Sequence, residues 1–285
     1  MTRRGAAPRR RAATHARRPG PGLRARLRPA LPSFGRIAAG LLTGLLIAGL
    51  VALVNGSWLR VVKVAWAGER YTTATDLQEV LAPLRGTPLL MVDAAGMADR
   101  LGRLPAVSEA RVEPLVPNLV RVTIVEKPAT FVWQTSAVRL LGAADGTLIG
   151  QVALQAELPS DLAALPLIDD RRAEGRDIIV GDRIDAALLA PALGLTAVDP
   201  AALGSQAGDL EVRLTDDDGF LLVSASPSWQ ADFGFFPPGD QARSGTLDER
   251  LKAQVAAVRT LFSIQPEAGI AWVDARDPER VYWRP

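Results

Sequence analysis

The longest apolar stretch of the chain lies near its N-terminus. Residues 37–59 contain no charged side chain and are rich in Leu, Ile and Val. As an α-helix, a run of this length spans about 34 Å, which is enough to cross the roughly 30 Å hydrocarbon core of a bilayer. Trp58, near the end of the run, suits the membrane–water interface. We therefore expect residues 37–59 to form a transmembrane helix.

After this run, the apolar spacing changes to that of a small mixed domain over residues 60–128. Alternating apolar residues predict a strand that ends at Gly68. Two short helices should follow, one with a capping box that begins at Thr75 and one with Asp93 as its N-cap. Two more strands are predicted over 110–116 and 119–125. The order strand, helix, helix, strand, strand predicts two helices on one face of a three-stranded sheet.

Residues 129–285 are expected to form a mixed β domain with packed helices. An apolar run over 184–195 predicts a helix that Pro191 interrupts. A capping box that starts at Thr246 precedes the clearest amphipathic helix of the chain. We expect residues 150–163 and 196–208 to be loops. Strands are predicted over 131–134, 139–141, 148–149, 210–224 (as a hairpin), 229–236, 269–276 and 279–285. The predicted fold class is therefore α+β behind a single membrane helix.

Charge is distributed very unevenly along the chain. Residues 1–36 carry eleven arginines and no acidic residue, whereas the rest carries 22 basic and 31 acidic residues. Basic residues that flank a first transmembrane helix are retained in the cytoplasm. We therefore expect a cytoplasmic N-terminus and an extracytoplasmic bulk over 60–285. A cleaved signal peptide is the alternative, but its apolar region is usually shorter, at about 7–15 residues.

The arginine-rich tail, residues 1–36, lacks any apolar period and should be disordered. Its predicted partner is anionic lipid at the membrane surface. Nucleic acid is not an expected partner, because binding of single strands favours interleaved aromatic residues and Phe34 is the only aromatic residue of the tail.

Small residues recur every four positions within the apolar run, most clearly Gly40, Gly44 and Ala48. On a helix this spacing places them along one face, where they allow a second helix to approach closely. We expect this stripe to pack against another membrane helix, with chance in a Gly- and Ala-rich segment as the alternative.

The chemistry of the extracytoplasmic part argues against an enzyme. The chain has no cysteine, and its only histidine, His15, lies in the tail. This excludes thiol chemistry and zinc or iron–sulfur sites with cysteine ligands. The three Lys residues after the apolar run form no SxxK arrangement with a serine, and the acidic cluster Asp216–Asp218 is expected to be a turn. We predict no catalytic residue, cofactor or metal.

Several short motifs resemble one family when they are taken in order. They are the strand that ends at Gly68, the segment Leu104–Val112, the turn Pro117–Leu119, the segment Val125–Ala129 and an aromatic-rich C-terminal strand. Together with the single anchor they resemble the FtsQ/DivIB bacterial cell-division proteins. The resemblance implies a basic cytoplasmic tail over 1–36, a transmembrane helix over 37–59, a POTRA domain over 60–128 and a C-terminal β domain over 129–285.

The resemblance also implies a function. Proteins of this family are scaffolds of the division septum in the cell membrane, and their β domain pairs with the bitopic proteins FtsB and FtsL. An open sheet edge offers main-chain groups to such a partner strand. By position, the partner surface here would include Trp272, Asp274, Arg276, Val281, Tyr282 and Trp283. The alternatives are a membrane-anchored cell-wall enzyme and a POTRA-type secretion or outer-membrane assembly factor.

Overall fold

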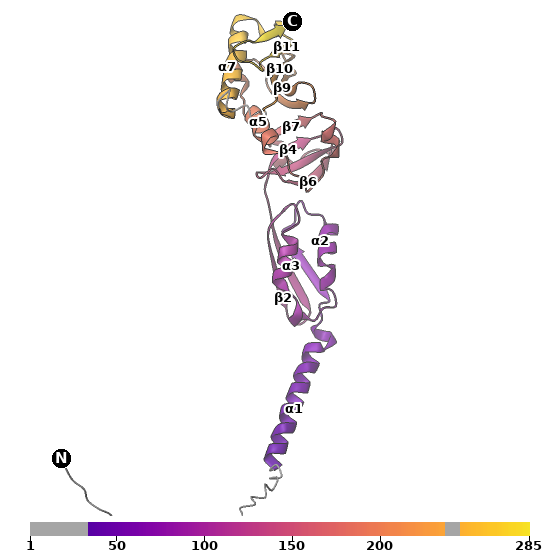
Figure 1. The fold of residues 1–285 in the computed structure, drawn as a ribbon. Helices are drawn as coiled ribbons and strands as arrows, with labels where there is room; N and C mark the ends of the chain where they lie inside the picture. Colours follow the sequence, from indigo (N-terminus) through magenta and orange to yellow (C-terminus); the bar gives the residue numbers. More distant parts are fainter. Residues whose placement is uncertain (1–33, 237–245) are drawn as a thin grey trace, which may run out of the picture. The chain divides into compact units, whose positions relative to one another are not determined.

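The computed structural model of the chain describes residues 34–236 and 246–285 (Figure 1). The predicted basic tail therefore falls almost entirely outside the described residues. The chain divides into two units, with the boundary after Val51. Helix α1 (Phe34–Asn55) accounts for the described part of the first unit and extends into the second.

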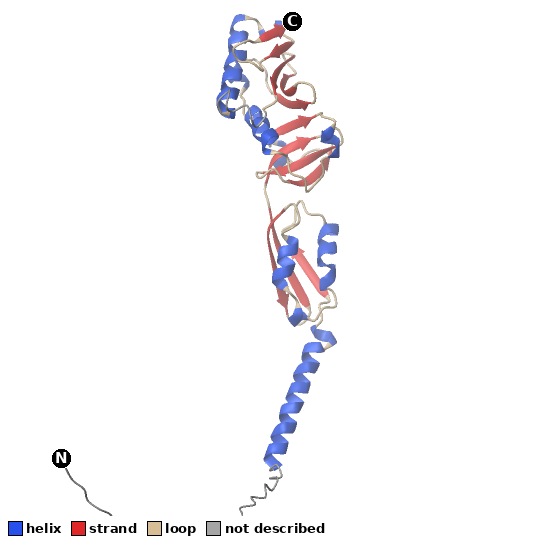
Figure 2. Ribbon diagram, in the orientation of Figure 1, coloured by secondary structure: helices blue, strands red, loops and turns tan. Residues whose placement is uncertain are grey.

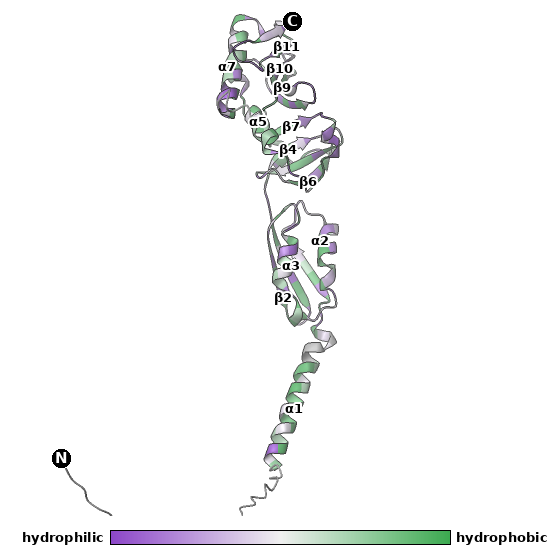
Figure 3. Cartoon of the chain, in the orientation of Figure 1, coloured by the Kyte–Doolittle hydropathy of each residue, from purple (hydrophilic) through white to green (hydrophobic). Residues whose placement is uncertain are grey.

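Helix α1 is long and apolar enough to cross a membrane, and its side chains over residues 34–52 are exposed. Figure 3 shows its largely hydrophobic colouring. The helix begins three residues earlier than predicted and ends four residues earlier, at Asn55. Trp58 lies instead in a 3-10 turn, η1 (Ser57–Leu59). The turn follows Gly56, where a Cβ atom would lie 2.6 Å from the indole nitrogen of Trp58.

A three-stranded sheet with two helices follows, as predicted. Its strands are β1 (Lys63–Ala67), β2 (Val107–Leu115) and β3 (Leu119–Glu126), in the order β1-β3-β2. Strand β3 is parallel to β1 and antiparallel to β2. Helices α2 (Ala74–Leu81) and α3 (Ala94–Leu101) pack their apolar sides on this sheet (Figure 1). The core contains Leu77, Leu81, Met97, Leu101, Val112, Val120, Val122 and Ile124, all buried.

The cap of α2 differs from the prediction. Thr73, rather than Thr75, precedes the helix, and its hydroxyl accepts a hydrogen bond from the amide of Asp76. The same hydroxyl donates to the Asp76 carboxylate at 2.7 Å. Asp76 follows Thr73 by three positions, the spacing that an N-cap needs. Asp93 caps α3 as predicted and accepts from the amide of Gly96.

Gly68 closes β1 in a conformation that only glycine adopts without strain. Its φ is +99°, and a Cβ atom there would lie 2.0 Å from the carbonyl oxygen of Ile124. We expect Gly68→Ala to lower the free energy of unfolding by about 2 to 3 kcal/mol, measured by urea unfolding of the full chain in detergent. Gly86→Ala is the matched control, because Gly86 also has a positive φ, +78°, but open space around it. Equal losses for both variants would show that the contact with Ile124 is unimportant.

The second sheet has nine strands. They are β4 (Ala129–Gln134), β5 (Val138–Ala143), β6 (Leu148–Ala153), β7 (Leu167–Asp170), β8 (Glu211–Thr215), β9 (Gly219–Ser224), β10 (Trp229–Gly234), β11 (Trp272–Asp274) and β12 (Tyr282–Arg284). Their order is β12-β11-β10-β9-β8-β7-β4-β5-β6. Three antiparallel groups, β4-β5-β6, β8-β9-β10 and β11-β12, are joined by parallel pairs. Strand β7 is parallel to both β4 and β8, and β11 is parallel to β10.

Helices α5 (Ala186–Thr196) and α7 (Leu247–Ile264) cover one face of this sheet (Figure 2). The capping box of Thr246 and Glu249 is present as predicted. The interruption predicted at Pro191 is wrong: α5 continues through this residue, which is buried in the helix. Strands β10, β11 and β12 are shorter than the strands predicted over 229–236, 269–276 and 279–285.

Parts of the predicted loops also form regular structure. Strand β6 extends to Ala153, and α4 (Ser160–Ala163) packs Leu162 against the sheet. The 3-10 helix η5 (Pro200–Leu203) buries Leu203 completely. The other 3-10 helices are η2 (Ala82–Leu84), η3 (Leu89–Met91), η4 (Glu174–Asp177) and η6 (Glu267–Gly269).

Candidate partner-binding edge of the nine-stranded sheet

Strand β12 is the last strand of the nine-stranded sheet. It pairs on one side with β11, in the register Trp272↔Arg284, Val273↔Trp283 and Asp274↔Tyr282. On its other side, no strand among the described residues pairs with it. An unpaired strand edge presents main-chain N–H and C=O groups that a strand from another chain can satisfy.

The two faces of the β11-β12 hairpin differ. Residues directly opposite each other in an antiparallel pair lie on the same face, so Trp283 shares the face of Val273, which is fully buried in the core. Trp283 itself remains 39% exposed. Tyr282 lies on the opposite face and is 62% exposed. Aromatic side chains of this kind are enriched at the centres of protein interfaces.

The face that carries Tyr282 also holds a stacked cation. The guanidinium carbon of Arg284 lies 4.7 Å from the ring centroid of Trp272, its partner in the register. This cation–π contact leaves Trp272 partly buried. The ring of Trp272 is therefore covered in part by Arg284 of the same hairpin, and Tyr282 is the more exposed aromatic residue of this face.

Arg276 lies just beyond β11 and joins two carboxylates. It binds Asp274 through its Nε at 2.9 Å and its Nη2 at 2.5 Å. Its Nε also lies 3.3 Å from Oδ2 of Asp232, a fully buried residue of β10. The hydrogen bond from Arg276 is the main reason that the pKa of Asp274 is lowered. Arg276 is thus committed to contacts inside the protein.

Asp232 carries a buried carboxyl group in an unfavourable environment. Burial raises the pKa of Asp232 to about 6, against the opposing effects of Arg276 and of the amide of Gly234, which donates to Oδ1. Two further carboxylates, Asp274 and Asp218, raise the pKa as well. Around neutral pH the ionised form therefore depends on Arg276.

Besides core packing and the Arg276–Asp232 contact, a short ladder and one glutamine hold the β11-β12 hairpin to the rest of the sheet. Strands β10 and β11 share three residue pairs, from Gln230↔Trp272 to Asp232↔Asp274. The buried amide nitrogen of Gln254, on α7, donates to the carbonyl of Phe233 at 3.0 Å and to that of Ala275 at 2.9 Å. The role of Gln254 was not predicted from the sequence. A signal was present, because Gln254 lies on the apolar side of the helix, and a buried polar side chain normally forms a hydrogen bond within the protein.

The structure brings the six predicted partner residues together in one hairpin, but in different roles. Tyr282 and Trp283 are exposed, and Trp272 and Asp274 are half-buried. Val281 packs against the core of the domain, so we assign it to holding β12 in place. Arg276 is engaged with Asp274 and Asp232, as described above. Whether these residues bind a partner stays a prediction.

The other open sheet edges are less suited to strand pairing. Strand β6, at the opposite end of the same sheet, is partly covered by main chain: Gly181 donates to the carbonyl of Leu148, and Leu148 donates to that of Asp182. Strand β2 carries Pro114 and several charged residues, which are features that protect sheet edges. Strand β1 begins at the exposed Lys63. Strand β12 alone combines an open edge with two exposed aromatic side chains among the described strands.

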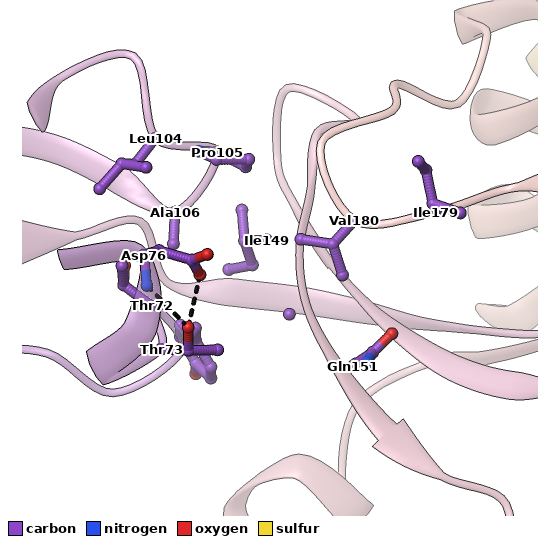
Figure 4. A pocket seen from close by; sticks show the side chains of 12 residues that line it. Thr72, Thr73, Asp76, Leu104, Pro105, Ala106, Ile149, Gln151, Ile179 and Val180 are labelled. Atoms are coloured by element: carbon purple, nitrogen blue, oxygen red, sulfur yellow. Dashed lines mark hydrogen bonds between the residues drawn. The ribbon is translucent and has the colours of Figure 1, made fainter. Parts of the chain in front are cut away.

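Potential metal ligands and the lining of pockets bear on catalytic chemistry in the described part of the chain. No group of three or more potential metal ligands occurs there. A pocket of about 390 Å³ lies between the start of α2 and strand β6 (Figure 4). Its walls are mainly apolar, and its one carboxylate, Asp76, is hydrogen-bonded to Thr73. The pocket therefore lacks the paired acid and base that hydrolytic chemistry requires.

The small-residue stripe of α1 is exposed, as are all residues of the helix over 34–52. Gly40, Gly44 and Ala48 are all exposed, and nothing lies within 4 Å of a Cβ atom built at either glycine. Their four-residue spacing places them along one face of the helix. Contact with a second membrane helix stays a prediction.

Comparison with known proteins places these features in a family context. The POTRA domain of FtsQ type matches residues 59–127. The chain is 30% identical over 184 residues, 65% of its length, to a protein from Chloroflexus aurantiacus named Cell division protein FtsQ. Proteins of the same name from Chloroflexus aggregans (29% identical over 42% of this chain and 48% of the relative) and Mycobacteroides abscessus (38% over 23% and 21%) are also similar. The chain spans 64% of the Chloroflexus aurantiacus relative. The resemblance expected from the sequence is confirmed.

Proposed function

Since residues 59–127 match an FtsQ-type POTRA domain and the chain is similar to FtsQ proteins over 65% of its length, we propose that it is a membrane-anchored scaffold of the bacterial cell-division machinery. In this proposal α1 is a single-pass anchor in the cell membrane, and the protein acts at the septum by binding other division proteins. It does so without catalysis. The arginines of the N-terminal segment support a cytoplasmic N-terminus and an extracytoplasmic bulk.

The partner-binding element in this proposal is the outer edge of β12. A partner strand would add to the sheet as a tenth strand, with main-chain hydrogen bonds providing affinity and alternate side chains providing selectivity. Tyr282 and Trp283 would contact the partner from opposite faces of the sheet, since successive side chains of a strand alternate. Bitopic division proteins of the FtsB and FtsL kind are the proposed partners. The observation that carries the proposal is the open β12 edge with its exposed aromatic pair.

Ending the chain after Val281 tests this proposal. The truncation removes β12 but keeps Val281, which packs on the core. We expect recovery of the bitopic division proteins from solubilised membranes to fall by at least about tenfold, because the main-chain bonds to the partner are lost. The truncated protein and the full chain are each purified from solubilised membranes, and the amounts of membrane proteins that co-purify with them are compared.

Two single substitutions serve as comparisons. Tyr282→Ala should weaken capture less than the truncation does, since the main-chain edge remains. Ile264→Ala removes a similarly exposed apolar side chain, 70% exposed, from α7 of the same domain and should leave capture unchanged. Capture at full strength by the truncated protein would contradict strand addition at β12.

A further inference from the structure

Three segments of the chain meet at one end of the POTRA domain, and we call them the tip loops: residues 58–63, 85–91 and 116–118. Main-chain hydrogen bonds connect them. The amide of Val61 donates to the carbonyl of Thr87 at 2.9 Å, and the amide of Gly86 donates back to the carbonyl of Val61 at 2.9 Å. The amides of Val62 and Lys63 both donate to the carbonyl of Asn118. The tip loops therefore form one continuous surface.

This surface is unusually apolar for an exposed one. Its large exposed side chains are Trp58 (65% exposed), Val62 (63%), Leu90 (64%), Met91 (64%) and Val116 (76%). Elsewhere in the described residues 60–128, Val125 is the only large apolar side chain with comparable exposure. Clustered exposed apolar side chains usually mark a surface that binds a protein or a membrane.

The exposure of Leu90 and Met91 is built into the local fold. Leu89 is buried in the domain core, and the amide of Met91 donates to the carbonyl of Pro88 at 2.9 Å. Residues 89–91 thus form a 3-10 turn in which one leucine anchors the loop and the next two side chains point away from the core. The apolar tip is a fixed feature of the loop and does not arise from a frayed end.

The charges of the tip loops all have one sign. Arg60, Lys63 and Arg85 are exposed, and the three segments contain no Asp or Glu. Nη1 of Arg60 donates to the carbonyl of Gly86 at 2.9 Å, which keeps its guanidinium beside the apolar tip. Apolar side chains flanked by cations match the chemistry of a bilayer surface, where acyl chains lie below anionic headgroups.

We infer that the tip loops bind the surface of the lipid bilayer, with Leu90, Met91 and Val116 in its interfacial layer. The inference rests on the proposed membrane anchoring by α1. Val62 follows Asn55, the last residue of α1, by only seven residues. Seven residues reach at most about 25 Å, so an α1 that crosses the bilayer keeps the tip loops close to the leaflet from which it emerges. A second membrane protein is the other class of occupant, and the test separates the two.

The chain contains no cysteine, so a single introduced cysteine can carry an environment-sensitive fluorophore without further changes. The variants Met91→Cys and Val116→Cys place the label on the tip loops. Val125→Cys is the matched control. Val125 is also exposed (53%), but it lies near the far end of β3, seven residues beyond the last tip-loop residue, Asn118. The full chain is reconstituted into vesicles of phosphatidylcholine, with and without phosphatidylglycerol.

At positions 91 and 116 we expect a blue-shifted emission and quenching by lipids with a nitroxide high on the acyl chain. Protection from aqueous iodide should be about threefold or more relative to position 125, as for side chains in the interfacial layer. Labels at 91 and 116 that iodide quenches as strongly as the label at 125 would overturn the inference. So would protection that arises only when a division partner is added, since the occupant would then be protein.

Two further variants keep the outcome interpretable. Leu90→Glu in the Val116→Cys protein should abolish lipid quenching without changing the unfolding midpoint, because Leu90 contributes little to the core. A label at Leu45→Cys, an exposed position of α1, should be quenched by nitroxides deep in the acyl region. Failure at position 45 would refute the membrane anchor itself, whereas success at 45 with failure at 91 and 116 would refute only the binding of the tip loops.

Discussion

Replacing Asp170 with alanine is expected to lower the free energy of unfolding by about 3 to 5 kcal/mol, the cost typical of removing one member of a buried ion pair. Asp170 is 1% exposed and lies on β7, the single strand that joins the two antiparallel groups β4-β5-β6 and β8-β9-β10. Its loss should therefore weaken the sheet at the point where the two groups meet.

Four hydrogen bonds converge on the Asp170 carboxylate. Nε of Arg172 donates to Oδ1 at 2.9 Å and its Nη2 donates to Oδ2 at 2.8 Å, a two-point contact. The amide of Arg172 adds a third bond, to Oδ1. The indole nitrogen of Trp133, a fully buried residue of β4, donates to Oδ2 at 3.0 Å. Alanine would leave both the Trp133 N–H and the largely buried Arg172 guanidinium without this acceptor, which is costly in a core.

The measurement is urea unfolding of the full chain in detergent, followed by tryptophan fluorescence. Lys252→Ala is the control, because Lys252 pairs with Asp248 at 2.6 Å but both side chains are more than 70% exposed. Exposed pairs of this kind contribute at most about 0.5 kcal/mol. A loss below about 1 kcal/mol for Asp170→Ala would show that water replaces the carboxylate, and the buried network would then not be a stabilising element.

Replacing Arg276 with methionine should destabilise the protein in a pH-dependent way. At pH 7.5 the buried Asp232 carboxylate would lose its only cationic neighbour in the described structure, at a cost of about 3 kcal/mol, the lower end of the range for such pairs because Arg276 is half exposed. Near pH 4 Asp232 is protonated in the folded state, and the loss should be small. Asp232→Asn in the same protein should restore most of the stability, because it removes the unpaired charge.

The sign of the pH dependence follows from the direction of the pKa change. The pKa of Asp232 is about 6 in the folded protein and about 4 in the unfolded chain. The folded state therefore binds more protons between these values, and the contribution of Asp232 to stability falls as the pH rises from about 4 to about 6. Asp232→Asn alone should remove this dependence and stabilise the protein at pH 7.5 by about 1 to 2 kcal/mol.

Unfolding of the Arg276→Met protein at pH 7.5 and pH 4.5, compared with the parent chain, measures both effects. Equal losses at the two pH values would mean that Arg276 stabilises the hairpin through packing of its aliphatic part against Gly234, whose Cβ position lies 3.0 Å from the Arg276 side chain. A loss confined to pH 7.5 supports the charge mechanism.

Much of the fold could be predicted because local signals agreed with the tertiary structure. The N-caps Asp93 and Thr246 and the alternation around Val122 each determine one element through its own residues. The position of Thr73 shows the limit of such signals. Both Thr73 and Thr75 are followed by side chains suited to a cap, and only the tertiary structure decides where the first helical turn begins.

The parallel joints of the nine-stranded sheet could not be predicted in the same way. Strand β7 has four residues and pairs with strands from two separate hairpins, so no local period reveals its position between them. The same holds for the candidate site. Tyr282 and Trp283 were identified because the C-terminal strand resembles that of the family. The contact between Arg276 and the buried Asp232 joins residues 44 positions apart, and no sequence pattern indicates it. Pro191 was misjudged because a helix held by tertiary contacts on both sides tolerates the loss of one hydrogen bond.

The attachment of the β11-β12 hairpin has a mechanical consequence. In the proposed role, a partner strand that pulls on β12 loads first the three residue pairs between β12 and β11. The next joint is that between β11 and β10, which is held by three pairs, by the Arg276–Asp232 contact and by the amide of Gln254. The joints of β7 with β4 and with β8 are equally short, at three pairs each, but they lie inside the sheet, further from a load applied at β12. If the proposed partner pulls on this edge, the terminal strands would therefore separate before the strands inside the sheet, and the partner would be released while the inner strands stay paired.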